Sequence, residues 1–146
     1  MAYSKDYKDD PTITDGDRLW RRLHPSQMTF DENLQRRRPS SAAFSDSSDG
    51  TAMSVSIVKL RPSDDPDVLV SEHPGEGIAE FTAGFARGLN QGVEHTPDEG
   101  GPDHGSVWDR KGNRSSGTRS KLAKGCEVLR EPAPHVEPRN PEHDTP

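Results

Sequence analysis

Apolar residues in this chain gather in short clusters separated by polar stretches that contain glycine and proline. The clearest cluster begins at Met53, where Met53, Val55 and Ile57 alternate with polar residues up to Leu60. This period of two, with β-branched residues, predicts a strand that has one apolar face. Shorter apolar runs predict further extended pieces at residues 28–30, 78–81, 105–108 and 126–129.

Helical spacing occurs at three places along the chain. Leu19, Trp20 and Leu23 predict a short helix that begins near Asp15 or Asp17 and ends before Pro25, because a residue before proline avoids helical geometry. Phe85 and Leu89 predict a second short helix, closed at Gly92. Ser115 or Ser116 is placed to cap a third helix that reaches Lys124 and stops at Gly125. Turns or loops are expected at residues 45–50, 61–67 and 94–103.

These segments together predict a small single α+β domain over residues 15–131, built from short strands with two or three short helices. The polar residues 1–14 and the proline-rich residues 132–146 are expected to be disordered tails. Only 27% of the residues are hydrophobic and the mean hydropathy is −1.01, so disorder throughout is the alternative.

Charge is segregated along the chain, although the formal net charge is only −6. Residues 18–38 contain six arginines, residues 110–130 contain seven basic residues, and residues 62–109 between them contain eleven acids with Arg87 as the one base. The basic and acidic segments either neutralise each other within the domain, or the basic ones form a surface that attracts phosphate or an acidic partner.

The chain contains a single cysteine, Cys126, so it has no internal disulfide and no paired-cysteine metal motif. Its position between a predicted helix and a predicted strand is typical of a small buried residue. The first residues lack the apolar stretch of a signal peptide, and no apolar run approaches the length of a membrane span. A cytoplasmic protein without membrane association is therefore expected.

Candidate chemistry is sparse. No motif for a nucleophilic serine and no cofactor-binding pattern occurs, and the six histidines lack the spacing of metal ligands. We therefore predict neither a metal nor a cofactor. Nucleic-acid binding is not expected either, because aromatic residues make up only 5% of an acidic chain.

Phosphate binding is the chemistry for which the sequence offers the most residues. Arg38, Ser40 and Ser41 lie around a proline and supply a guanidinium and two hydroxyls that can bind phosphate. Arg22 and Lys111 are further candidate ligands for phosphate, and His24 or His104 is a candidate acid–base group because histidine titrates near neutrality.

Several short elements resemble a family of small, uncharacterised bacterial proteins over residues 18–130. They are Arg-Arg-Leu-His-Pro at 21–25, Arg-Pro-Ser-Ser-Ala-Ala-Phe at 38–44, Met-Ser-Val at 53–55, Phe-Thr-Ala-Gly at 81–84, Gln-Gly-Val at 91–93 and the later His104. That resemblance implies no activity. Residues 18–60 are also similar to ADP-ribosyltransferase-like toxins, which consume NAD and begin with an arginine near a histidine–proline turn.

Two functions follow as hypotheses. The lack of a complete catalytic constellation favours a non-enzymatic bacterial accessory domain that binds a protein partner. The alternative is a small enzyme or binding protein that acts on NAD or on another nucleotide or phosphate compound.

Overall fold

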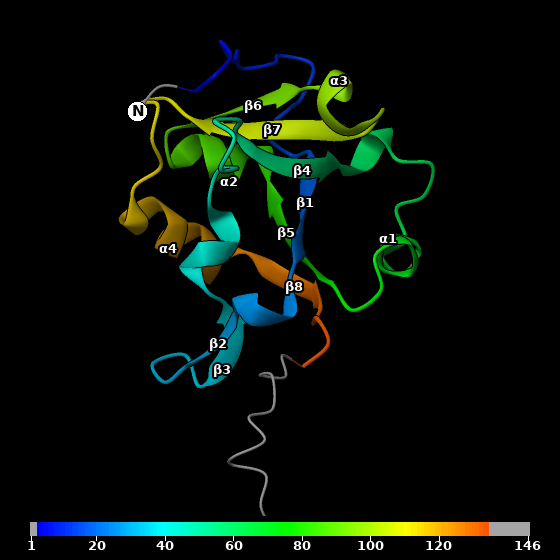
Figure 1. Cartoon of the computed structure of the whole chain (residues 1–146), viewed down its shortest axis with the longest axis vertical. Coiled ribbons are helices and arrows are strands. Elements are labelled where there is room, and N and C mark those ends of the chain that lie inside the picture. Colours follow the sequence, from blue (N-terminus) through cyan, green and yellow to red (C-terminus); the bar gives the residue numbers. More distant parts are fainter. Residues whose placement is uncertain (1–2, 135–146) are drawn as a thin grey trace, which may run out of the picture.

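The fold is built on a six-stranded antiparallel sheet, described here by a computed structural model for residues 3–134 (Figure 1). Its strands in spatial order are β6 (Gln91–His95), β7 (His104–Asp109), β4 (Met53–Ile57), β1 (Arg18–Leu23), β5 (Gly77–Thr82) and β8 (Glu127–Arg130). A separate hairpin consists of β2 (Met28–Asp31) and β3 (Arg36–Pro39). The predicted extended pieces are thereby confirmed.

Short helices connect the strands. The α-helices are α1 (Pro66–Glu72), α2 (Ala83–Gly88), α3 (Pro97–Gly100) and α4 (Ser116–Gly125), and the 3-10 turns are η1 (Pro25–Gln27), η2 (Ser41–Phe44) and η3 (Val58–Leu60). The predicted third helix is confirmed as α4, where the Ser115 hydroxyl accepts a hydrogen bond from the backbone N–H of Thr118. The predicted α+β class is confirmed.

The sheet has an apolar cluster on each face. The larger cluster joins the inward residues of β1, β4, β5, β6 and β7 to α2, α4 and η2. The smaller one contains Trp20, Val58, Leu69 and Ile78, so that α1 is held on the sheet by a single fully buried residue, Leu69. This second face is left polar over β4 and β7, and the candidate site lies there.

The predicted helix over residues 19–23 is wrong, because this segment is the central strand β1. All six of its residues pair with β5, in a register that runs from Arg18 opposite Thr82 to Leu23 opposite Gly77. Leu19 and Leu23 belong to the larger cluster, whereas Trp20 is buried in the smaller one on the opposite face. A strand buried on both faces places apolar residues next to each other, and this spacing is also compatible with a helix.

The loops predicted at 61–67 and 94–103 need correction, since each contains part of a helix. In α1 the Asp65 carboxylate accepts the backbone N–H of Asp67, and Pro66 occupies the first helical position, where its missing N–H costs nothing. Pro97 likewise occupies the first position of the short α3, which lacks a side-chain capping bond. An acidic residue before proline was the local signal for α1.

Gly92 does not close the second helix as predicted. The helix α2 ends at Gly88, Asn90 turns the chain with a φ of 65°, and Gly92 lies within β6. A Cβ at Gly92 would lie 2.2 Å from the Trp108 ring, so the close packing of Trp108 on β6 requires glycine.

The N-terminal boundary of the domain also needs correction. Residues 3–14 contain no helix or strand, but Tyr7 and Ile13 are buried and the segment runs along the outer strand β6. The backbone N–H of Asp10 donates to the Val93 carbonyl at 2.8 Å, and the Asp9 carboxylate accepts the Val93 N–H at 2.9 Å. The domain therefore begins before residue 15, because these residues cover the exposed edge of the sheet.

At the other end, residues 131–134 contain no helix or strand, and the rest of the predicted tail, residues 135–146, lies outside the described residues. The backbone N–H of Ala133 donates to the Gly75 carbonyl at 2.9 Å, so the chain follows β5 slightly past the predicted boundary.

Replacement of Ile13 tests whether the N-terminal segment belongs to the domain. Ile13 is 1% exposed, and we expect Ile13→Ala to lower the free energy of unfolding by about 2–4 kcal/mol, measured by urea denaturation. Lys8→Ala is the control, because the Lys8 side chain is 78% exposed, and it should change the value by less than about 0.5 kcal/mol. Equal effects of the two variants would show that the segment does not contribute to the core.

Candidate functional site

A polar cleft of about 400 Å³ opens on the sheet where the two central strands separate. The register of β1 with β4 contains only Leu19 opposite Ile57 and Trp20 opposite Ser56, whereas β1 pairs with β5 along its whole length. In Figure 1 the group β6, β7 and β4 accordingly crosses the group β1, β5 and β8. The separation leaves a space between two rigid half-sheets.

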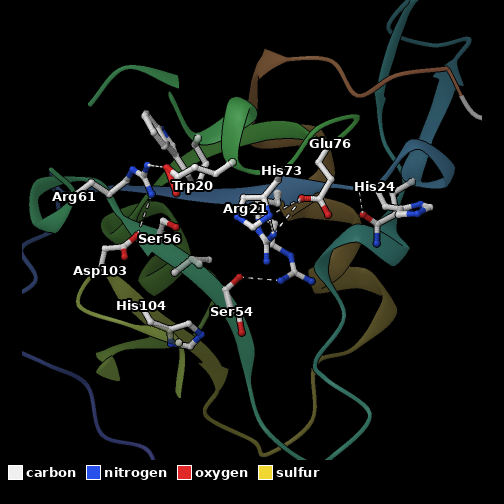
Figure 2. A pocket seen from close by; sticks show the side chains of 16 residues that line it. Trp20, Arg21, His24, Ser54, Ser56, Arg61, His73, Glu76, Asp103 and His104 are labelled. Carbon is white, nitrogen blue, oxygen red and sulfur yellow. Dashed lines mark hydrogen bonds and ion pairs between the residues drawn. The ribbon is translucent and has the colours of Figure 1, made fainter. Parts of the chain in front are cut away.

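The cleft brings together side chains from segments far apart in the sequence (Figure 2). It is lined by three arginines, three histidines, two serines and three carboxylates: Arg21, Arg22, Arg61, His24, His73, His104, Ser54, Ser56, Glu72, Glu76 and Asp103. Strand β1 supplies the first two arginines, β4 the serines, and the segment 61–76 with α1 covers one side. Such a lining suits a polar, charged ligand.

Arg21 fills the gap between the separating strands. Its guanidinium donates to the backbone carbonyls of Ala43 and Ser54, both at 2.8 Å, and to that of Ser45 at 3.5 Å. Figure 2 shows the bond to Ser54 on the opposite wall of the cleft. Three of its five N–H donors are thus used, and all three are used by neutral acceptors.

The charge of Arg21 has no carboxylate next to it in the described part of the chain. Burial lowers the pKa of the Arg21 guanidinium to about 10, and the neighbouring charges of Arg114 and Arg22 act in the same direction. The side chain is still protonated at pH 7, so the cleft holds a half-buried positive charge that Asp46 offsets only at longer range.

The other two arginines of the cleft are ion-paired. Arg22 donates to His73 Nδ1 and to Glu76, the latter at 3.2 Å. Arg61 contacts Glu72 and Asp103, each at 3.2 Å, and lies over the Trp20 ring at 5.8 Å from its centroid. These pairs hold both arginine head groups in place and use the three carboxylates of the cleft.

His24 and His104 are each held through one ring nitrogen. His24 Nδ1 accepts the backbone N–H of Ser26 at 3.2 Å and so caps η1, and its exposed ring lies at the edge of the cleft (Figure 2). His104 Nδ1 lies 2.8 Å from the Thr96 hydroxyl. Burial lowers the pKa of His104, whereas the carboxylates of Glu99, Asp103 and Asp98 and the backbone of Thr96 act in the opposite direction. His104 is therefore neutral at pH 7.

The structure brings three of the predicted site residues into this cleft: Arg22, His24 and His104. The remaining four, Arg38, Ser40, Ser41 and Lys111, do not line it. Arg38 lies on the β2–β3 hairpin and pairs with Asp31 at 2.6 Å, while Ser40 precedes η2 and Ser41 begins it. Lys111 lies in the turn after β7, where its backbone N–H donates to Asp109.

The sequence interpretation missed Arg21, Arg61 and His73, and it also missed the serines of β4. Arg21 was placed on the polar side of a helix, and only the two-sided burial of β1 turns it toward the protein interior. The alternation that predicted β4 did contain a signal, since Ser54 and Ser56 occupy its polar face.

Many of the segregated charges are satisfied within the domain. The guanidinium of Arg114 is 1% exposed and donates to Asp46, to Gln91 and to the carbonyls of Phe44 and Val107. Arg130 pairs with Asp67 at 2.7 Å, so the basic C-terminal part of the domain contacts the acidic middle directly. Internal neutralisation accounts for these arginines without a ligand.

Other classes of site are not formed by the described residues. No group of three or more His, Cys, Asp or Glu within residues 3–134 is arranged to hold a metal ion. None of the helices in that range is long and apolar enough to cross a membrane. Comparison of the chain with protein-family models, curated proteins and solved structures gives no match, so the two family resemblances stay predictions.

The thiol of Cys126 is expected to be inert in the folded protein. Cys126 is 7% exposed, and burial raises its pKa to about 11, which disfavours the reactive thiolate. At pH 8 a thiol reagent such as dithiobis-nitrobenzoate should react at least about 100-fold more slowly with the native chain than with the urea-unfolded chain. Equal rates, followed by absorbance, would contradict the burial of this residue.

Proposed function

We propose that this protein binds a small phosphate-bearing molecule, of the size of a nucleotide, in the cleft between β1 and β4. The observation that carries the proposal is Arg21, a half-buried guanidinium that, among residues 3–134, has no adjacent carboxylate and two N–H donors without an acceptor. A buried charge without a partner is costly, and an anionic ligand removes that cost by forming charge-assisted hydrogen bonds.

The groups around Arg21 support a phosphate rather than a carboxylate or a lipid. The hydroxyls of Ser54 and Ser56 are further donors in the cleft, and they make no hydrogen bond among the described residues. A cleft lined by several donors suits the multiple oxygens of a phosphate-bearing ligand. The nearby carboxylates are held by Arg22 and Arg61, which reduces their repulsion of an anion.

The size of the cleft supports a ligand larger than inorganic phosphate. Its volume of about 400 Å³ lies in the range of small-molecule sites, roughly 300–1,000 Å³. Trp20 lines the cleft. Its ring lies under the Arg61 guanidinium, and its Nε1 donates to Glu80 at 2.8 Å. The cleft therefore suits a polar, anionic ligand such as NAD or another nucleotide.

A panel of phosphate compounds tests this function. Inorganic phosphate, pyrophosphate, AMP, ATP and NAD should each be measured by thermal shift and calorimetry with the full chain, and at least one nucleotide should raise the melting temperature. Arg21→Lys keeps the charge but removes the planar fork of donors. We expect it to weaken that binding by roughly 10-fold to 100-fold, which corresponds to the loss of about one charge-assisted hydrogen bond.

Arg38→Lys is the matched control, since Arg38 also bonds a backbone carbonyl but lies outside the cleft. It should leave the affinity unchanged. The proposal fails if no compound of the panel binds, or if the two arginine variants weaken binding equally. Circular dichroism of both variants checks that the fold is retained.

A second candidate function, the binding of a protein partner, is favoured by the β2–β3 hairpin. This hairpin is separate from the main sheet and projects from it in Figure 1. Phe30 is 57% exposed and Leu34 is 44% exposed, next to the exposed Arg36 and Arg37. Exposed aromatic and arginine side chains together are typical of protein interfaces, and the arginines favour an acidic partner.

The hairpin function is tested by recovery of a companion from the native host. If wild-type chain recovers one protein in stoichiometric amount, the double variant Phe30→Ser, Leu34→Ser should lose it. The control is Leu60→Ser, Val68→Ser, which removes the other two exposed large apolar side chains among the described residues. Recovery that both double variants retain, or both lose, would contradict a role of the hairpin.

A further inference from the structure

A chain of hydrogen bonds links His104 in the cleft to the carboxylate of Glu99. His104 Nδ1 lies 2.8 Å from the Thr96 hydroxyl, which lies 2.8 Å from the Ser106 hydroxyl, and Ser106 lies 3.4 Å from Glu99 Oε2. Thr96 is 2% exposed and Ser106 is 0% exposed, so the two middle members are shielded from water.

The N-terminal segment holds the Glu99 end of this series of hydrogen bonds. Lys5 Nζ donates to Glu99 Oε2 at 2.9 Å, and the Tyr7 hydroxyl donates to Glu99 Oε1 at 3.1 Å. Tyr7 is itself held, because its oxygen accepts the backbone N–H of Ala52 at 3.1 Å. An ion-paired carboxylate can only accept hydrogen bonds.

Counting protons along the chain fixes the direction of every bond. Glu99 accepts, so the single proton of Ser106 is donated to it. The bond between the two hydroxyls must then use the proton of Thr96, and the bond between Thr96 and His104 must use a proton on Nδ1.

We infer that Glu99, through Ser106 and Thr96, holds neutral His104 in the tautomer protonated at Nδ1, so that unprotonated Nε2 is the proton acceptor of the cleft. The role as acceptor for a bound ligand rests on the proposed function, whereas the tautomer is a property of the ligand-free protein. Glu99, Ser106 and Thr96 are then positioning residues, and Lys5 and Tyr7 support them from the N-terminal segment.

The two histidines of the cleft thereby acquire opposite roles. Nδ1 of His24 accepts a backbone N–H, so neutral His24 carries its proton on Nε2 and offers a donor. Nε2 of His104 offers a lone pair. One histidine of the cleft thus offers a donor and the other an acceptor, and the acceptor could take a proton from a ligand hydroxyl.

The test is the tautomer of His104 in the ligand-free, full-length chain. Long-range ¹⁵N–¹H correlation spectra distinguish the protonated from the unprotonated ring nitrogen, and the His104→Gln spectrum assigns the signals. At a pH above the pKa of His104 we expect the wild type to be protonated at Nδ1. Thr96→Val, which removes the acceptor of that proton, should shift the ring toward protonation at Nε2.

Two matched variants keep the test decisive even if Thr96→Val does not fold. Glu99→Ala removes the acceptor at the end of the chain, so the fraction protonated at Nε2 should increase and the pKa of His104 should fall. Asp98→Ala removes the neighbouring carboxylate, whose side chain is 74% exposed and pairs with Lys5, and it should leave the tautomer unchanged.

A wild-type His104 protonated at Nε2 would overturn the inference, as would a folded Glu99→Ala variant with the tautomer of the wild type. If no phosphate compound binds, the proposed function is contradicted, but the spectra still report the tautomer of His104. The two proposals can therefore fail separately.

Discussion

The fold and the cleft both depend on one interaction, the insertion of the Arg21 guanidinium between β1 and β4. Two central strands that separate expose backbone carbonyls that the sheet no longer pairs, and unpaired carbonyls in a shielded place are costly. Arg21 satisfies the Ser54 carbonyl of β4 and, with the same guanidinium, the Ala43 carbonyl of η2, so it links η2 to both strands. The same group gives the cleft its positive charge, so structure and candidate function share one residue.

Buried arginines replace apolar packing elsewhere in this chain too. Only 27% of its residues are hydrophobic, which limits the size of the core. The buried Arg114 bonds Gln91, Asp46 and two backbone carbonyls. The half-buried Arg87 pairs with Asp9 and Asp15 and so connects the start of the chain to α2. The low hydropathy therefore reflects a domain held partly by hydrogen-bonded ion pairs rather than an absence of order in the described residues.

The N-terminal segment acts on the cleft although it does not line it. Its backbone covers the edge of β6, and its Lys5 and Tyr7 side chains reach Glu99, from which hydroxyls lead to His104. A polar segment without helix or strand thus contributes to the core through Ile13 and to the site through Glu99. Local composition gave no indication of this, because both contributions depend on contacts with residues more than 80 positions away.

The sequence by itself determined the α+β class, the strand β4 and the capped helix α4, since alternation and capping are local properties. Three of the residues that the sequence singled out, Arg22, His24 and His104, line the cleft, and their role there stays a prediction. Only the tertiary structure decided that residues 18–23 form a strand, as burial on both faces overrides the local periodicity. It also decided which arginine remains without a carboxylate, because pairing depends on strand order and register and not on neighbours in the sequence.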